Sequence, residues 1–276
     1  MAWRQAVSIV DLGKAAWQRL GGDGSALIEV PDDNVAWPAS DHVVTIAHNA
    51  GDNLTATERS LRHGAAVIEI DVVSFRERLY AGHRRPISWI GPWLFRRPTL
   101  EQIWAVSAPA AVMLDLKESS PAFLERLFTF LSVHARDRLV ILVSGNPATL
   151  EAFQRRMPEV IRLYGASPTG RLEAFMQDDE LIALVDGLNL RHDRIDSAVG
   201  AWTTKRGLWL IAWPVNEFQR ARDLIKCGVD IITTDNLAMM TAINGDVHDL
   251  IKRRRGARHN TNPVDVSTGP VREGRE

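Results

Sequence analysis

From Val43 to about Lys252 the chain alternates short apolar runs with longer amphipathic segments. Most of the runs are rich in Val, Ile and Leu and show little polar alternation, which is typical of parallel strands covered on both faces. They predict eight strands, at Val43–Ala47, Ala66–Val73, Ala111–Leu116, Leu139–Ser144, Val160–Tyr164, Leu184–Leu190, Leu208–Trp213 and Asp230–Thr234.

The segments between these strands predict helices, several of them bounded by Pro at the start or Gly just past the end. Their expected ranges are Thr57–His63, Thr99–Val106, Pro121–His134, Pro147–Met157, Arg171–Met176, Asn216–Cys227 and Leu237–Lys252. Eight strands alternating with helices predict an α/β fold, a (β/α)8 TIM barrel. An open doubly wound sheet is the alternative. No Gly-x-Gly-x-x-Gly turn follows the first strand, which disfavours only its nucleotide-binding form.

We expect a single barrel domain over residues 41–252. Residues 1–40 read as an N-terminal extension with an amphipathic helix that packs on the barrel. Residues 253–276 begin with three arginines and continue with Gly, Asn, Pro, Ser and Thr without periodicity, so we expect a disordered tail.

Composition narrows the functional classes. The 276 residues include 33 Lys+Arg and 34 Asp+Glu, a net charge of −1, which gives no support for a nucleic-acid partner. One cysteine, Cys227, cannot form an internal disulfide. No apolar run approaches the ~20 residues of a membrane helix, and the N-terminus lacks the features of a signal peptide. We therefore expect a cytoplasmic protein without an integral membrane segment; the sequence does not predict its oligomeric state.

In a barrel, functional side chains gather where strands end at the carboxyl-terminal rim. Glu69 and Asp71 are two residues apart within an apolar strand and so point to the same face. Two carboxylates on one buried face repel each other, an arrangement that a divalent cation such as Mg²⁺ or Ca²⁺ would make favourable. A salt-bridge network with Lys or Arg is the structural alternative.

Three further strand ends carry polar residues. Asp115 and Lys117 share a face at the end of the third strand, where they could add a carboxylate to the cation and a contact to phosphate. His48 directly follows the first strand, and His83 lies in an excursion after the second. A strand-capping His48, a plain Asp115–Lys117 pair and a surface-loop His83 are the ordinary interpretations. Together, however, these residues suit metal-assisted cleavage of a phosphodiester with two proton-transferring imidazoles.

The order of these motifs resembles the glycerophosphodiester phosphodiesterase family, a TIM barrel of the phospholipase C-like kind. The resemblance runs from about Val43 to Leu237. It is carried by Ala47-His48, His63-Gly64-Ala65, Ile68-Glu69-Ile70-Asp71-Val72, His83, Leu114-Asp115-Leu116-Lys117, Ala212-Trp213-Pro214-Val215-Asn216 and the stretch from Cys227 to Asp235.

The resemblance implies roles for these positions. It implies His48 and His83 as the acid–base pair, with one divalent ion bound by three carboxylates (Glu69, Asp71 and Asp115). It implies Lys117 near the phosphate and Trp213 lining the pocket. In that family a neighbouring substrate hydroxyl can attack phosphorus to give a cyclic phosphate, which water then opens.

The sequence departs from the family in three places. Asn49 stands where the family has Arg, so the same substrate-contacting position offers a neutral amide instead of a bidentate guanidinium; Arg84, Arg85 and Arg191 are candidates to compensate. The Pro-Glu-Asn segment after the first strand is missing from the shortened loop 51–56. The stretch 83–98 is compact and carries Trp89 and Trp93.

The leading hypothesis is a metal-dependent phosphodiesterase that acts on a glycerophosphodiester or lysophospholipid-like substrate, releasing an alcohol and glycerol phosphate. Two features, Asp115 in place of Glu and Asn49 in place of Arg, also resemble the sphingomyelinase D and phospholipase D toxins. A phospholipase D-like activity on a lipid is therefore one alternative. A barrel that binds a phosphorylated ligand without efficient catalysis is the other.

Overall fold

The computed structural model describes residues 43–83, 97–166, 170–243 and 245–252. The expected N-terminal extension, the tail, Trp89, Trp93, Arg84 and Arg85 lie outside the described residues. The statements that follow concern the described ranges.

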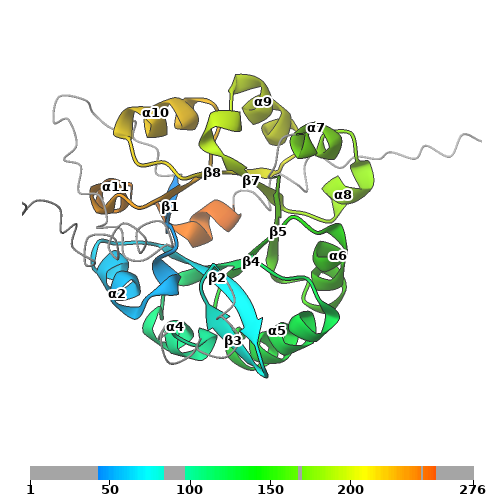
Figure 1. The fold of residues 1–276 in the computed structure, drawn as a ribbon. Coiled ribbons are helices and arrows are strands. Elements are labelled where there is room, and N and C mark those ends of the chain that lie inside the picture. Colours follow the sequence, from blue (N-terminus) through cyan, green and yellow to red (C-terminus); the bar gives the residue numbers. More distant parts are fainter. Residues whose placement is uncertain (1–42, 84–96, 167–169, 244, 253–276) are drawn as a thin grey trace, which may run out of the picture.

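Eight parallel strands close into a barrel that is ringed by helices, as Figure 1 shows in a view along the barrel. Closure comes from β1, which pairs with β2 on one side and with β9 on the other. The (β/α)8 prediction is confirmed, and the open sheet is excluded. The barrel strands are β1 (Val44–Ala47), β2 (Val67–Phe75), β4 (Ala111–Leu116), β5 (Val140–Ser144), β6 (Ile161–Gly165), β7 (Gly187–Arg191), β8 (Trp209–Trp213) and β9 (Ile231–Thr234).

A ninth strand, β3 (Arg78–Ala81), pairs antiparallel with the end of β2. The sequence predicted an excursion here but not a strand. The hairpin turns at the carboxyl end of β2 and brings the chain back to the middle of that strand, where the Gly82 N–H donates to the Asp71 carbonyl over 2.8 Å. It thereby delivers His83 to the rim.

The α-helices are α2 (Leu54–Arg62), α4 (Leu100–Val106), α5 (Pro121–His134), α6 (Pro147–Arg156), α7 (Arg171–Phe175), α8 (Asp179–Ala183), α9 (Ser197–Lys205), α10 (Phe218–Lys226) and α11 (Leu237–Ala242); η1 (Ala50–Asp52) and η2 (His192–Arg194) are 3₁₀ turns. Side-chain caps explain several starts. Asn53 accepts from the Thr55 and Ala56 N–H groups at α2, and Thr99 forms a capping box with Gln102 at α4.

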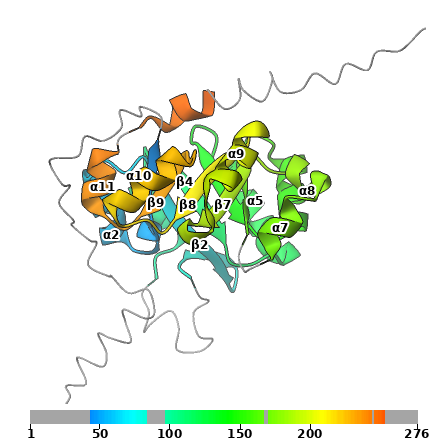
Figure 2. The same cartoon turned by 90° about the horizontal axis from the view of Figure 1, so that it is seen from above.

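Two hydrophobic clusters form the core. One lies between the strands and the surrounding helices, and the other fills the barrel interior. The interior cluster includes Val247, Leu250 and Ile251 of a helix at 247–252. Figure 2 shows this orange helix at the opposite end of the barrel from the β2–β3 hairpin. Apolar packing thus closes the barrel at one end. The polar candidate residues lie at the other end.

The structure corrects two predicted elements and contains two helices that were not predicted. The range Leu237–Lys252 is not one helix, because α11 ends at Ala242 and a separate helix spans 247–252. The strand expected from Leu184 begins only at Gly187, since the preceding apolar residues end α8 and its turn. Helices α8 and α9 were not predicted at all.

Candidate active site

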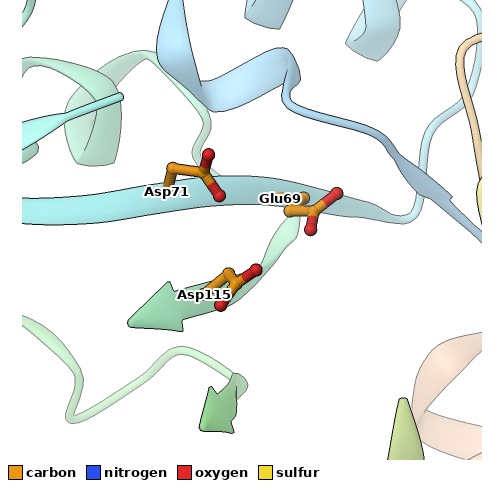
Figure 3. Close-up of side chains that lie close together, drawn as sticks. All are labelled: Glu69, Asp71 and Asp115. Carbon is orange, nitrogen blue, oxygen red and sulfur yellow. The ribbon is translucent and has the colours of Figure 1, made fainter. Parts of the chain in front are cut away.

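Three carboxylates lie together at the carboxyl end of β2 and β4. Glu69, Asp71 and Asp115 each offer an oxygen within 4.8 Å of the others, and Figure 3 shows the three groups converging from the two strands. The register explains this arrangement, because Asp71 pairs with Asp115 across the parallel ladder and Glu69 lies two residues earlier on the same face. Glu69 and Asp71 are buried.

Two basic side chains already contact this cluster. The Lys117 Nζ lies 2.9 Å from Asp71 Oδ1 and 2.6 Å from Asp115 Oδ2. The His83 Nδ1 lies 2.9 Å from Asp71 Oδ2, while the His83 side chain stays 66% exposed. These contacts outweigh burial and lower the pKa of Asp71. The salt-bridge alternative is therefore realised for Asp71 and Asp115, with Lys117 as the partner.

Glu69 is different, because no ammonium or guanidinium of the described residues pairs with it. Its Oε2 accepts the Asn49 backbone N–H over 3.2 Å. Burial, together with the charges of Asp115 and Asp71, raises the pKa of Glu69 to about 7 despite the nearby His48. Burial likewise raises the pKa of Asp115. The cluster holds more negative charge than its neighbours neutralise.

His48 lies at the end of β1 with a carboxylate partner of its own. Its Nδ1 is 2.9 Å from Asp235 Oδ1, and its Nε2 is 3.3 Å from the Asn49 amide nitrogen. Burial opposes protonation of the ring, but the hydrogen bond to Asp235 and the charge of Glu69 prevail and raise the pKa of His48 to about 9. Each predicted imidazole is thus oriented through Nδ1 by an aspartate.

Asp235 is itself held in place. The Asn216 amide donates from Nδ2 to Asp235 Oδ2 over 3.0 Å and accepts from the Asp235 backbone N–H over 2.8 Å. The chain from Asn216 through Asp235 to His48 links the ends of β8, β9 and β1. In the sequence, Asn216 and Asp235 are recognisable only as parts of motifs, which predict no role for either; the available signal was an acid directly after a strand.

Asp52 was also missed. Its Oδ1 accepts the Asp71 backbone N–H over 3.1 Å, and burial beside Asp71 raises its pKa well above the usual value. The next residue, Asn53, caps α2. The loop at 51–56, which departs from the family's Pro-Glu-Asn segment, still supplies an acid that contacts β2 beside the three carboxylates and an amide that caps the following helix.

The remaining predicted positions lie at the same rim. Asn49 adopts a left-handed backbone conformation (φ 48°) directly after β1. Trp213 ends β8 on the interior-facing side, in register with Arg191 at the end of β7. Arg191, a candidate to replace the missing guanidinium, is exposed and ion-paired with Asp193.

This donor set fits a divalent cation. Three carboxylates at mutual reach are the hard oxygen ligands that Mg²⁺ and Ca²⁺ prefer. A dication would also relieve the repulsion that raises the pKa of Glu69.

Comparison with known proteins finds similarity in structure only. No model of a protein family matches the chain, and no curated protein matches its sequence. A phosphodiesterase from Oleispira antarctica, solved with its product sn-glycerol-3-phosphate, is 20% identical, with a TM-score of 0.61 over 73% of this chain and 97% of that one.

A glycerophosphodiester phosphodiesterase from Parabacteroides distasonis is 18% identical, with a TM-score of 0.59 over 80% of this chain and 98% of that one. A calcium-dependent phosphoinositol-specific phospholipase C from Pseudomonas sp. is 11% identical, with a TM-score of 0.52 over 72% and 91%. At these identities the comparison confirms, at the level of the fold, the resemblance seen in the motifs. None of the described helices is long and apolar enough to cross a membrane.

Proposed function

We propose that this chain is a metal-dependent phosphodiesterase that cleaves a glycerophosphodiester or lysophospholipid-like substrate into an alcohol and glycerol phosphate. One observation carries the proposal: two imidazoles, each held by an aspartate, flank a cluster of three carboxylates at one barrel end. The fold shared with phosphodiesterases supports it.

Glu69, Asp71 and Asp115 would hold the cation. When bound, a divalent ion neutralises phosphate charge and lowers the pKa of a bound hydroxyl. The Lys117 ammonium, now shared by two of the carboxylates, lies where it can turn to the phosphate oxygens and stabilise the negative charge that develops on them.

The two histidines divide the proton transfers. With Nδ1 donating to Asp235, the ring of His48 would present Nε2 to accept the proton of a substrate hydroxyl next to the phosphate. Attack of that oxygen on phosphorus would break the bond to the alcohol and leave a cyclic phosphate, which water would open to glycerol phosphate. His83 is the more exposed ring, and its Nε2 would protonate the leaving oxygen, which would depart towards solvent. Asn49 would contact the phosphate as a neutral donor.

The test is a product screen on the full chain with glycerophosphocholine and a lysophospholipid, in the presence of Mg²⁺ or Ca²⁺. The proposal expects metal-dependent release of glycerol phosphate or its lipid form. Activity should be lost in His48→Gln and in His83→Gln and kept in His134→Gln, which alters a histidine at the end of α5.

Two other results would contradict the proposal. Release of choline from either substrate with a cyclic phosphate left unopened, and therefore without glycerol phosphate or its lipid form, would favour the phospholipase D-like alternative. Stabilisation by phosphorylated ligands without turnover under either metal would favour a binding protein.

A further inference from the structure

Three polar atoms in the interior half of the site lack a hydrogen-bond partner among the described residues. They are Asn189 Oδ1 on β7, Trp213 Nε1 on β8 and Thr233 Oγ1 on β9, from three consecutive strands. Asn189 is only 6% exposed and Thr233 is fully buried. A buried polar atom without a partner costs about 1–3 kcal/mol, so three on neighbouring strands call for an explanation.

The register places Asn189 and Thr233 on the inner face of the barrel. Asn189 pairs with Ile211 and Thr233 pairs with Ile46, both of which belong to the interior cluster. The neighbours of Asn189 along β7, Leu188 and Leu190, belong instead to the cluster under the helices.

Both residues lie one layer below the rim. In a (β/α)8 barrel, alternate strands contribute four side chains to each interior layer. Glu69 precedes Asp71 by two residues, and in the same way Asn189 precedes Arg191 and Thr233 precedes Asp235. Glu69, Asn189 and Thr233 therefore share one interior layer, and Val143 is its fourth member. Glu69 lies on one side of this layer, and the two neutral polar side chains face it.

The layer above carries a glycine on this side. Its members come from the other four strands and include Trp213 and Gly165. A Cβ on Gly165 would have Val143 Cγ1 at 3.3 Å and backbone atoms at 3.9 Å as its nearest neighbours. The side chain that would cover Asn189 from β6 is therefore absent.

We propose that Asn189 and Thr233, with Trp213 above them, bind hydroxyl groups of the phosphorylated alcohol, so that the site selects a polyol over a plain alkyl chain. An amide oxygen accepts, an indole N–H donates and a threonine hydroxyl does both, which matches hydroxyl groups. None of the three is charged, so the set does not suit a second phosphate. This inference rests on the proposed function, because the cation and Lys117 would hold the phosphate.

The experiment is calorimetric titration of the metal-loaded full chain with sn-glycerol 3-phosphate, propyl phosphate and inorganic phosphate. The unmodified protein should bind glycerol phosphate at least about fivefold more tightly than propyl phosphate, the value of one net hydrogen bond. Thr233→Val keeps the side-chain shape, and Asn189→Leu removes the amide. Each should bring that ratio close to one while the affinity for inorganic phosphate changes less than about twofold.

Thr149→Val is the matched control. Thr149 is equally buried and its hydroxyl likewise lacks a partner, but it lies on α6 in the helix layer. This variant should leave the ratio unchanged. A ratio near one in the unmodified protein, or the same ratio in Thr233→Val, overturns the inference and means that water alone satisfies these atoms. Failure to bind any of the three phosphates in the presence of metal overturns the proposed function as well.

Discussion

Substitution of Glu69 tests whether this carboxylate is a metal ligand or only a structural acid. Because its folded pKa, about 7, is raised, the ionised carboxylate destabilises the metal-free fold. The cost grows as pH rises from about 4.5 and is complete above pH 7. We predict that Glu69→Gln raises the free energy of unfolding by about 1–3 kcal/mol at pH 8 in EDTA.

The same variant should lose most of the stabilisation that Mg²⁺ or Ca²⁺ gives the unmodified protein, because a ligand is gone. Urea unfolding with and without metal measures both effects. Glu159→Gln, which alters an exposed acid in the loop before β6, should change neither. Full stabilisation of Glu69→Gln by metal would contradict the ligand assignment, and lower stability of this variant in EDTA would contradict the destabilising effect of the ionised carboxylate.

Asp235 is a positioning residue, since it acts through His48. Asp235→Asn should lower kcat by about 100-fold or more, because an amide no longer fixes the imidazole with its Nδ1–H towards the acid. It should also move the pKa of His48 in the metal-free protein down from about 9, which NMR titration of the ring measures. Asp223→Asn, on α10, is the control; an unchanged pKa of His48 would remove Asp235 from the mechanism.

The candidate residues could be predicted where strand alternation and a short motif coincide. Glu69, Asp71 and Asp115 share a face because of the two-residue period, which is visible in the sequence. Asp52 and Asp235 could not be recognised in the same way. Their partners, the Asp71 N–H and the His48 ring, lie 19 and 187 residues away in the chain, and only the closure of the barrel brings them together.

At the scale of elements, strands were predicted more reliably than helices because buried parallel strands are continuous apolar runs. Helix α9 was not predicted because it has little amphipathic pattern and an internal glycine in its sequence, Ser-Ala-Val-Gly-Ala-Trp-Thr-Thr-Lys. That glycine has a packing cause: a Cβ on Gly200 would lie 1.5 Å from the Cys227 carbonyl oxygen. A close approach to a distant segment is invisible in local periodicity.

The helix at 247–252 closes the barrel at the end away from the site. Leu250 packs in the interior cluster, so Leu250→Ala should lower the free energy of unfolding by about 2–4 kcal/mol. Because the carboxylates lie at the opposite end, the affinity for Mg²⁺ or Ca²⁺ should stay within about twofold. His248→Ala, on the exposed side of the same helix, should change stability little. Denaturant unfolding and metal titration give the two values; a large loss of metal affinity in Leu250→Ala would mean that the two ends are coupled.

At the scale of the whole molecule, a chain with a net charge of −1 concentrates acids at one end of its barrel. In the metal-free protein this local field favours the protonated form of His48, whose folded pKa of about 9 exceeds the reference value of 6.5. The proton on His48 therefore contributes stability that is fully present below pH 6.5 and is lost as pH rises through 9. A base in this state cannot accept a proton at neutral pH.

A bound dication would reverse that balance. Two positive charges at Glu69, Asp71 and Asp115 repel a proton on the nearby imidazole and offset the acids that favour it. We predict that saturating Mg²⁺ or Ca²⁺ lowers the pKa of His48 by at least one unit, so that the ring becomes a competent base near neutral pH. NMR titration of the His48 ring protons in EDTA and in metal measures the change, and the His134 signals should not respond to metal. An unchanged pKa of His48 at saturating metal would mean that the cation binds elsewhere.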